Sequence, residues 1–467
     1  MMLGSAIVSM AQNEDDAIRY INIVPAGTAK FNSMGGAMGA IGADFTAMSI
    51  NPAGLSVTRS GYFSVTPSWN TSKVKSTYYG ESGKVSKTNF NFSNIGFSNT
   101  YETGIDKGCK SVSFGFAYNR LTDFNRSVFV KGENDYSMLD YEIDFFDENY
   151  DNLFYDADLF IMDSASGYYY TDYEMAGSYG SRQSKKLKSS GSVGEYAIMM
   201  GFNLNDKWYF GASFNIMRID YFQSSKYEET PSHPISLDNF SVYDEFHSVG
   251  GGINVKLGTI YWLNDNVRLG LAYHTPTIVQ MEDDYYDEVV SSIYYDEENL
   301  GTNKANSSGA IDWELNTPGR FIASLALVSQ KLGMIDVDCE VVNYSNVSLD
   351  THNHHYDFSY VNDVISDIYR TNVNLRVGGE LLVGPMALRG GVGYYGSPYV
   401  NDHENSKSSI MSYSAGVGFR MPGLYVDLGY SLNTKSETYY LYGYDDSASK
   451  LKNMKGNFAL TIGFRYK

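Results

Sequence analysis

Short segments in which apolar side chains alternate with small or polar ones constrain this chain more than any other feature. In residues 458–466, large apolar side chains occupy every even position, and Ala, Thr, Gly and Arg occupy the odd positions. The pattern recurs in residues 112–119, 208–216, 267–274 and 388–394. A period of two indicates β-strands with one apolar face. Because the opposite face is small and rich in Gly, we expect a curved wall around a lumen or plug.

The same reading, extended along the chain, predicts fourteen strands. They are residues 61–71, 88–100, 110–124, 193–204, 208–222, 244–263, 267–281, 313–329, 334–346, 370–383, 386–395, 410–420, 424–434 and 456–467. An even number of antiparallel strands is typical of a bacterial outer-membrane barrel with both termini on one side.

The connections between these strands alternate in length. The tight ones are 205–207, 264–266, 330–333, 384–385 and 421–423, and the long ones are 125–192, 223–243, 282–312, 347–369, 396–409 and 435–455. Short turns on one rim and long loops on the other are the outer-membrane pattern. The sequence therefore predicts an outer-membrane protein with extracellular long loops and periplasmic short turns. Trp69, Trp208, Trp262 and Trp313 are expected near the strand ends, as in an aromatic girdle.

Charge and hydropathy exclude two classes of protein. The net charge of −19 argues against nucleic acid as a partner, because duplex binding needs a basic face. After the N-terminus the sequence has no run of about 18 apolar residues, which a helical membrane span would need.

The N-terminal sixty residues do not have the strand pattern. Residues 1–11 hold an apolar run with Ser9 and Ala11 at the spacing of a signal-peptidase site, which predicts the remnant of a signal peptide; a buried N-terminal helix is the alternative. Residues 12–60 are rich in Gly and Ala, which allows close backbone packing and predicts a plug inside the lumen. The barrel would then comprise residues 61–467. A phosphate-binding Gly loop is disfavoured, because it needs a βαβ unit.

Four segments resemble one family of membrane proteins. They are GTAKFNSMGGAMGAIGADFTAMSINPAGL (27–55), FGFAYNRLTDFNR (114–126), NVRLGLAYHTPT (266–277) and GYYGSPY (393–399). With the fourteen predicted strands, they are similar to FadL-type outer-membrane transporters of long-chain fatty acids and aromatic hydrocarbons. The resemblance covers essentially the whole mature chain.

The resemblance implies a function and a gating segment. In that family the plug is called the hatch, and Asn51, Pro52 and Ala53 match the motif tied to its gating, with Gly35 and Gly36 in the same segment. Hydrophobic substrates pass into the lumen beside the hatch by diffusion and leave sideways at a kinked third strand. In this chain the apolar parity switches within the second predicted strand, 88–100, which indicates a β-bulge there.

Parity within the strands also predicts which side chains face the lumen. The apolar candidates are Met199, Met217, Ile219 and Val342, which either contact a hydrophobic ligand or pack against the hatch. The charged candidates are Asp336, Asp338, Glu340, Arg376, Glu380 and Arg389. These charges either brace the hatch as a network or, through Arg376 and Arg389, guide a carboxylate headgroup.

Other possible chemistry is limited. Acidic residues cluster in 133–174 and 282–298, where they are either solvated or bind divalent cations. His352, His354 and His355 could form a small metal site, although we assign no metal and no cofactor. No HExxH, GxSxG or paired Cys motif is present, and His274 as a catalytic base is less plausible than His274 as a structural residue, so we expect no enzyme.

The sequence thus predicts a hatch-gated, monomeric, passive channel for hydrophobic small molecules such as fatty acids, surrounded by outer-membrane lipid and lipopolysaccharide. The alternative is a related accessory barrel that docks proteins for a secretion or surface-attachment system. A polar-solute porin is disfavoured by the plug.

Overall fold

The structure is a computed structural model, and it describes residues 14–146, 152–164, 166–177, 179–296, 299–351, 357–443 and 445–466. The helices are α1 (Glu14–Ile21), α2 (Ala29–Ser33), α3 (Phe45–Ile50), α4 (Met138–Asp144), α5 (Leu153–Asp156), α6 (Asp172–Ala176) and α7 (Ser359–Ile368), with 3-10 turns η1 (Pro52–Leu55), η2 (Tyr344–Asn346), η3 (Glu404–Lys407) and η4 (Asp445–Ser447). The predicted signal remnant 1–11 and His352, His354 and His355 lie outside the described residues. No described helix is long and apolar enough to cross a membrane.

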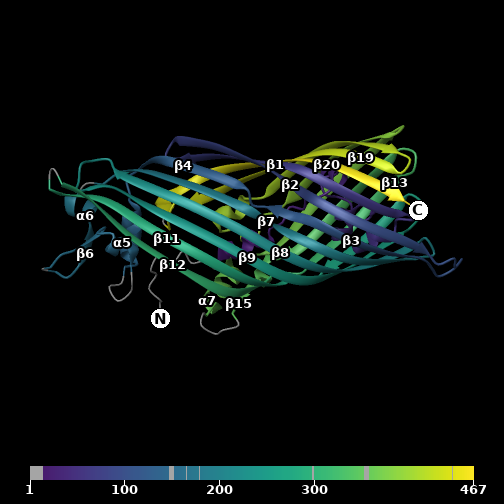
Figure 1. The fold of residues 1–467 in the computed structure, drawn as a ribbon, viewed down its shortest axis with the longest axis horizontal. Coiled ribbons are helices and arrows are strands. Elements are labelled where there is room, and N and C mark those ends of the chain that lie inside the picture. Colours follow the sequence, from purple (N-terminus) through teal and green to yellow (C-terminus); the bar gives the residue numbers. More distant parts are fainter. Residues whose placement is uncertain are drawn as a thin grey trace.

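One closed antiparallel sheet forms the molecule's wall (Figure 1). Its strands are β1 (Gly61–Tyr78), β2 (Glu81–Glu102), β3 (Cys109–Asp123), β4 (Arg126–Asn134), β7 (Ser181–Leu204), β8 (Trp208–Pro231), β9 (Leu237–Trp262), β10 (Val267–His274), β11 (Ile278–Asp296), β12 (Asn299–Asn316), β13 (Arg320–Ser329), β14 (Gly333–Asn343), β15 (Ser348–Asp350), β16 (Thr371–Val383), β17 (Met386–Tyr395), β18 (Ile410–Met421), β19 (Leu424–Tyr440) and β20 (Ala448–Tyr466), while β5 (Phe160–Met162) and β6 (Tyr169–Thr171) form a separate hairpin. The barrel closes because β1 pairs with both β2 and β20.

The prediction of a fourteen-stranded barrel is confirmed, with four of the strands in two pieces. β3 and β4 form the third strand, β10 and β11 the seventh, β12 and β13 the eighth, and β14 and β15 the ninth. The seventh is interrupted at Pro276 and the eighth at Pro318, which were predicted to lie within continuous strands. Proline has no N–H to donate to a ladder, so each strand breaks there.

An apolar belt covers the outside of the wall. Large apolar side chains point outward on every side, among them Phe116, Ile198, Leu257, Leu325, Val377 and Leu428. An exposed band of this kind is stable only in contact with lipid. The alternation that predicted the strands is therefore the alternation between lipid and lumen.

Several strands continue far beyond the belt, where the sequence predicted loops. Most of the predicted loop 223–243 belongs to β8 and β9, and most of the predicted loop 282–312 belongs to β11 and β12. In β11 the outward Glu282 and Asp284 are exposed, whereas the inward Asp283 is buried. With polar residues on both faces, the apolar period of two disappears although the strand continues. Figure 1 shows these long strands running toward α5 and α6 at one end of the molecule.

The predicted bulge in the second strand is confirmed. Thr66 pairs with Asn94 and the next residue, Pro67, pairs with Phe92, so Ser93 is the extra residue of β2. The extra residue explains why the outward apolar parity changes from Phe92 to Ile95.

The prediction of an aromatic girdle holds for two of the four Trp residues and is wrong for the other two. Trp69 and Trp208 face outward and are 41% and 44% exposed. Trp313 is buried in the lumen, where its indole N–H donates to Asp283 at 2.6 Å. Trp262 also points inward, against Tyr209 and under the guanidinium of Arg268. Position near a strand end does not determine which face a side chain occupies; parity does.

Candidate functional site

A compact, buried segment fills the barrel at the level of the belt. This segment, residues 28–58, contains α2, α3 and η1, and we call it the hatch. Each short helix begins at a side-chain cap: Thr28 accepts from the N–H of Phe31, Asp44 from those of Thr46 and Ala47, and Asn51 from that of Ala53. Caps supply acceptors for N–H groups that such short helices cannot pair internally.

Glycines on the lumen face of the wall allow the hatch backbone to approach closely. A Cβ on Gly391 would lie 2.3 Å from the backbone nitrogen of Gly35, and a Cβ on Gly378 would lie 2.1 Å from the Met34 carbonyl oxygen. Gly211 faces the Pro52 carbonyl in the same way. Gly35 has a φ of +64°, which favours glycine at that position as well.

Gly36 also has a positive φ, +79°, and packs beside the Arg376 side chain. The structure therefore brings both predicted hatch glycines into contact with the wall formed by β16 and β17.

Asn51 links three parts of the site. Its side-chain amide donates to the Gly39 carbonyl at 2.8 Å and to the Thr259 carbonyl of β9 at 3.2 Å, and its oxygen caps η1 at Ala53. Pro52 then begins η1 against Gly211. The segment for which the family resemblance implies gating is thus held to the wall by hydrogen bonds and by backbone contact.

Two carboxylates of β14 bind the backbone of the hatch. Asp338 accepts from the N–H groups of Met38 and Gly39, each at 3.2 Å, and Asp336 accepts from that of Ala40 at 3.2 Å. Both carboxylates are fully buried. Hydrogen bonds from N–H groups replace part of the hydration that the carboxylates lose on burial.

The remaining predicted charges pair with one another. Arg376 donates to Glu340 at 3.0 Å and lies 3.7 Å from Asp338, and Arg320 also binds Glu340 at 3.0 Å. Arg376 is fully buried. Its charge is therefore directed at carboxylates of the wall.

A second group of paired charges lies nearer the short turns. Arg389 binds Glu380 at 2.7 Å and Asp427 at 2.6 Å, and Arg420 binds Glu380 at 3.1 Å. Of the alternatives for Arg376 and Arg389, the contacts favour a network that braces the lumen.

Sequence reasoning missed a third brace. Lys256 of β9 forms an ion pair with Glu195 of β7 at 2.7 Å and donates to the Ser49 carbonyl at 3.0 Å, at the end of α3. The Ser49 hydroxyl donates to Glu195, and His274 contacts the Ile50 carbonyl at 2.8 Å. The inward parity of Lys256 and Glu195 within their strands could have predicted this ion pair. The contact of His274 fits the structural role that the sequence analysis preferred for it.

The apolar lumen candidates separate into two groups. Met199 packs with Phe45, Met48 and Leu55 of the hatch. Met217, Ile219 and Val342 instead belong to a larger apolar cluster above the hatch, together with residues of α1. We call this larger cluster the apolar chamber.

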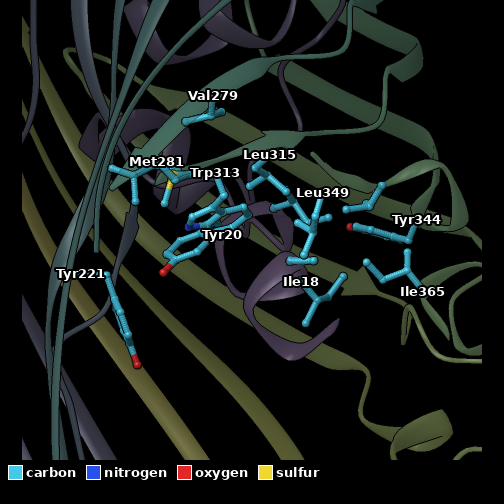
Figure 2. Packing of buried hydrophobic residues seen from close by; sticks show 14 of the residues in the cluster. Ile18, Tyr20, Tyr221, Val279, Met281, Trp313, Leu315, Tyr344, Leu349 and Ile365 are labelled. Carbon is cyan, nitrogen blue, oxygen red and sulfur yellow. The ribbon is translucent and has the colours of Figure 1, made fainter. Parts of the chain in front are cut away.

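The helix α1 fills the apolar chamber. Its Ile18 and Tyr20 point toward Trp313, Leu315 and Leu349 (Figure 2). The Tyr20 ring also contacts Phe124 and Tyr221 edge-on. The chain's own N-terminal helix therefore occupies the most apolar part of the lumen.

Beside α1 lies a cavity of about 300 Å³. Its charged lining residues are Arg19, Arg120, Asp123, Arg126, Lys435, Glu437 and Lys455. Among the described lining residues, five cations against two carboxylates give a formal charge of +3, although the whole chain carries −19. The ammonium of Lys455 donates to the Asp123 carbonyl at 3.2 Å and forms no ion pair with any described carboxylate. We call this space the cationic cavity.

The cationic cavity reaches a discontinuity in the wall. β3 pairs with β2 only as far as Asn119, opposite Asn94, and then the third strand breaks at Phe124 and Asn125. Beyond the break β4 pairs with β7 alone, and β2 residues 81–92 pair only with β1 among the described strands. Ser93, Phe124 and Asn125 line the cavity.

We call this discontinuity, between β2 residues 81–93 and β4, the seam. Here β4 and the β1–β2 hairpin overlap, and no ladder of backbone hydrogen bonds joins them. β4 lies on the lumen side of the β1–β2 hairpin, where the Phe129 carbonyl accepts from the inward Ser76 hydroxyl at 2.5 Å. The break therefore lies in the third strand and the bulge, Ser93, in the second, on opposite sides of one seam.

Known structures share this architecture over nearly the whole chain. A FadL homologue from Pseudomonas aeruginosa superimposes with a TM-score of 0.60 at 14% identity, covering 95% of this chain and 99% of the other. The chain has the FadL fold. The toluene transporters TodX of Pseudomonas putida (TM-score 0.56, 14% identity, 95% and 99% covered) and TbuX of Ralstonia pickettii (0.53, 15%, 96% and 100%) have the FadL fold as well. No protein family and no curated protein matches the sequence itself.

The connections at the end of the barrel opposite the short turns form a cap over the lumen, and this cap has its own hydrophobic core. α4, α5, the β5–β6 hairpin and Tyr173 of α6 pack against inward side chains such as Tyr78, Tyr227 and Phe240. Buried Glu229 of β8 accepts from the hydroxyls of Tyr173 and Tyr227. Among the described residues, no group of three or more side chains is arranged to bind a metal ion.

Proposed function

We propose that the protein is a passive outer-membrane channel for amphipathic anions with a long apolar chain, such as long-chain fatty acids. In this proposal the capped end is extracellular and the short turns are periplasmic. The observation that carries it is the position of the cationic cavity between the apolar chamber and the seam in the wall. One ligand with a charged head and an apolar tail would fit both compartments.

The cationic cavity would hold the headgroup. Arg126 keeps one ion pair, with Glu437 at 2.7 Å, and Lys455 has none among the described residues. A ligand carboxylate beside these two side chains would make charge-assisted hydrogen bonds with them. The surplus of cations favours an anion over an uncharged hydrocarbon, although the toluene transporters with this fold suggest that an apolar tail suffices in other channels.

The apolar chamber would hold the tail. Burial of apolar surface stabilises a complex by roughly 25 cal/mol per Å². Because Ile18, Tyr20 and Ile21 of α1 already cover this surface, an alkyl chain gains that energy only by displacing α1. We propose that α1 moves with the hatch, and that Asn51, Pro52 and Ala53, together with Gly35 and Gly36, set how readily it does so.

The seam would be the exit. A ligand in the cationic cavity lies beside Ser93 and the break at Phe124 and Asn125, where no ladder of backbone hydrogen bonds joins β2 to β4. Passage there breaks side-chain contacts alone. Passage along the barrel axis would require disruption of the hatch, with its buried ion pairs and backbone packing.

Uptake of labelled oleate by a Gram-negative host that lacks its own fatty-acid channel tests the proposal. We expect the intact chain to restore uptake and the Arg126→Gln/Lys455→Gln variant to reduce it about tenfold, since two charge-assisted contacts are lost. Lys107→Gln/Lys331→Gln, on exposed short turns, is the control for the change in net charge. An Asn51→Ala/Pro52→Ala variant at equal surface expression tests gating. Absence of uptake by a folded intact chain would contradict the proposal.

A second function, protein docking by an accessory barrel, is favoured by one observation. The tip of the cap exposes large apolar side chains: Tyr168 is 69% exposed, Met175 63% and Met162 52%. Exposed apolar groups of this size often mark protein contacts. Replacement of Met162 and Met175 by Gln should leave oleate uptake unchanged if the first proposal holds, and should abolish cross-linking to surface proteins if the second does.

A further inference from the structure

The outward face of β19, β20, β1 and β2 changes from apolar to basic at a sharp boundary. These strands lie side by side in the sheet (Figure 1). Trp69 of β1 pairs with Phe458 of β20 and Phe90 of β2, and the three rings are in contact at the edge of the apolar belt. Aromatic side chains in such a row mark the interface between hydrocarbon and headgroups.

Five exposed lysines lie on the same face beyond this row. They are Lys73, Lys75, Lys84, Lys450 and Lys452, and we call them the lysine patch. Lys75 pairs directly with Lys84 on one side and with Lys452 on the other, so three ammonium groups occupy one row across three strands. Like charges at directly opposite positions destabilise a sheet. No described carboxylate forms an ion pair with any of the five, so nothing within the described chain offsets this repulsion.

The patch is local. On β11, at the far side of the barrel, the outward residues beyond the belt include the acidic Glu282, Asp284 and Glu288. On β19, beside the patch, the outward Ser436 and Thr438 are uncharged. A chain with a net charge of −19 therefore concentrates unpaired cations on one side of its outer surface.

The height of the patch above the belt indicates what the lysines meet. Lys73 and Lys75 lie four and six residues beyond Trp69, or about 13 and 20 Å along the strand at 3.3 Å per residue. With strands tilted by about 40°, these lengths place the ammonium groups roughly 10 to 15 Å above the aromatic row. Headgroups of the lipids that surround a barrel begin just above that row, within reach of flexible lysine side chains.

We propose that the lysine patch binds the phosphate groups of anionic glycolipid in the outer leaflet of the membrane. The proposal rests on the orientation given under the proposed function, in which β1 and β20 extend outward beyond the belt. Phosphates supply the missing counter-charge for the Lys75, Lys84 and Lys452 row, and the acyl chains of the same lipid contact the Trp69, Phe90 and Phe458 rings. An acidic protein would match the charge but not the adjoining apolar surface.

Lipid binding to the purified full-length barrel tests this assignment. The detergent-solubilised protein is titrated with diphosphoryl lipid A, and bound lipid is counted by native mass spectrometry. We expect the Lys75→Gln/Lys84→Gln/Lys452→Gln variant to bind on the order of a hundredfold more weakly at low salt, with the difference shrinking as salt is added. The control is Lys107→Gln/Lys207→Gln/Lys331→Gln, which removes three exposed lysines from the short turns.

The remaining outcomes separate the partners and the functions. Dephosphorylated lipid A should bind the parent and the patch variant equally weakly. Equal lipid A affinity of parent and patch variant, an equal loss in the control, or preference of the parent for polyglutamate over lipid A would overturn the proposal. Heat-dependent mobility in gels verifies that each variant is folded. Oleate uptake by the patch variant should match the parent, so failure of the patch is distinguishable from failure of the channel.

Discussion

Substitution of a single lumen-facing glycine should loosen the hatch while leaving the barrel wall intact. In Gly391→Ala, the new Cβ would lie 2.3 Å from the Gly35 nitrogen and from the Met34 carbonyl carbon, far inside the normal contact distance. The hatch backbone must move by about an ångström, and overpacking of this kind costs roughly 1–3 kcal/mol. If the wall holds its shape, that cost falls on the docked hatch and raises the population of its displaced state about 5- to 150-fold.

Gly390→Ala is the matched control. Gly390 is the preceding residue of the same strand, faces outward, and would place its Cβ 3.9 Å from its nearest neighbour, the Ser414 carbonyl oxygen. Hydrogen exchange of the amides in residues 29–55 is the assay, with wall amides as internal reference. Faster exchange of the hatch in Gly391→Ala alone is expected. Equal exchange in the two variants would refute the reasoning that backbone contact holds the hatch.

Two further predictions concern buried charge. Glu195→Gln leaves Lys256 as an uncompensated buried charge and should destabilise the hatch by about 3–5 kcal/mol, whereas a Glu195→Leu/Lys256→Met double variant should recover most of the loss in hydrogen exchange. In the cap, burial and the neighbouring Asp244 raise the pKa of Glu142 to about 8 from its usual 4.5, despite Lys185. Between pH 4.5 and 8 the folded cap holds a proton that the unfolded cap releases, so its stability falls by roughly 1.4 kcal/mol per pH unit and levels off above pH 8. Proteolysis of the cap from pH 5 to 9 should show a slope that is smaller in Glu142→Gln than in the parent by this amount.

The strands could be predicted from the sequence where the two faces of a strand meet different environments. At the belt, lipid requires large apolar side chains on one face and the hatch requires small ones on the other, so Gly391 and Val392 already indicate the register of β17. Beyond the belt both faces of β11 are polar, and the acidic run from Glu282 to Glu288 resembles a solvated loop. The strand persists there because β9 and β12 supply ladder partners, which is information outside the local sequence.

The site was predictable in part for the same reason. Parity placed Asp338 and Arg376 in the lumen, but not the partners of Asp338, since the N–H groups of Met38 and Gly39 lie about 300 positions away in the sequence. Lys256 has equally clear inward parity and was overlooked. Nothing in the apolar residues of the chamber indicated that α1 would cover them, because a packed helix and a bound alkyl chain require the same side chains.

The location of a bound ligand tests the central proposal most directly. Anomalous diffraction from crystals soaked with a fatty acid brominated at its terminal carbon would show the head and the tail separately. We predict the carboxylate beside Arg126 and Lys455, and the bromine in the apolar chamber in the place of Ile18 and Tyr20. Bromine found only at the exposed side chains of the cap, with α1 still seated in the chamber, would contradict the account.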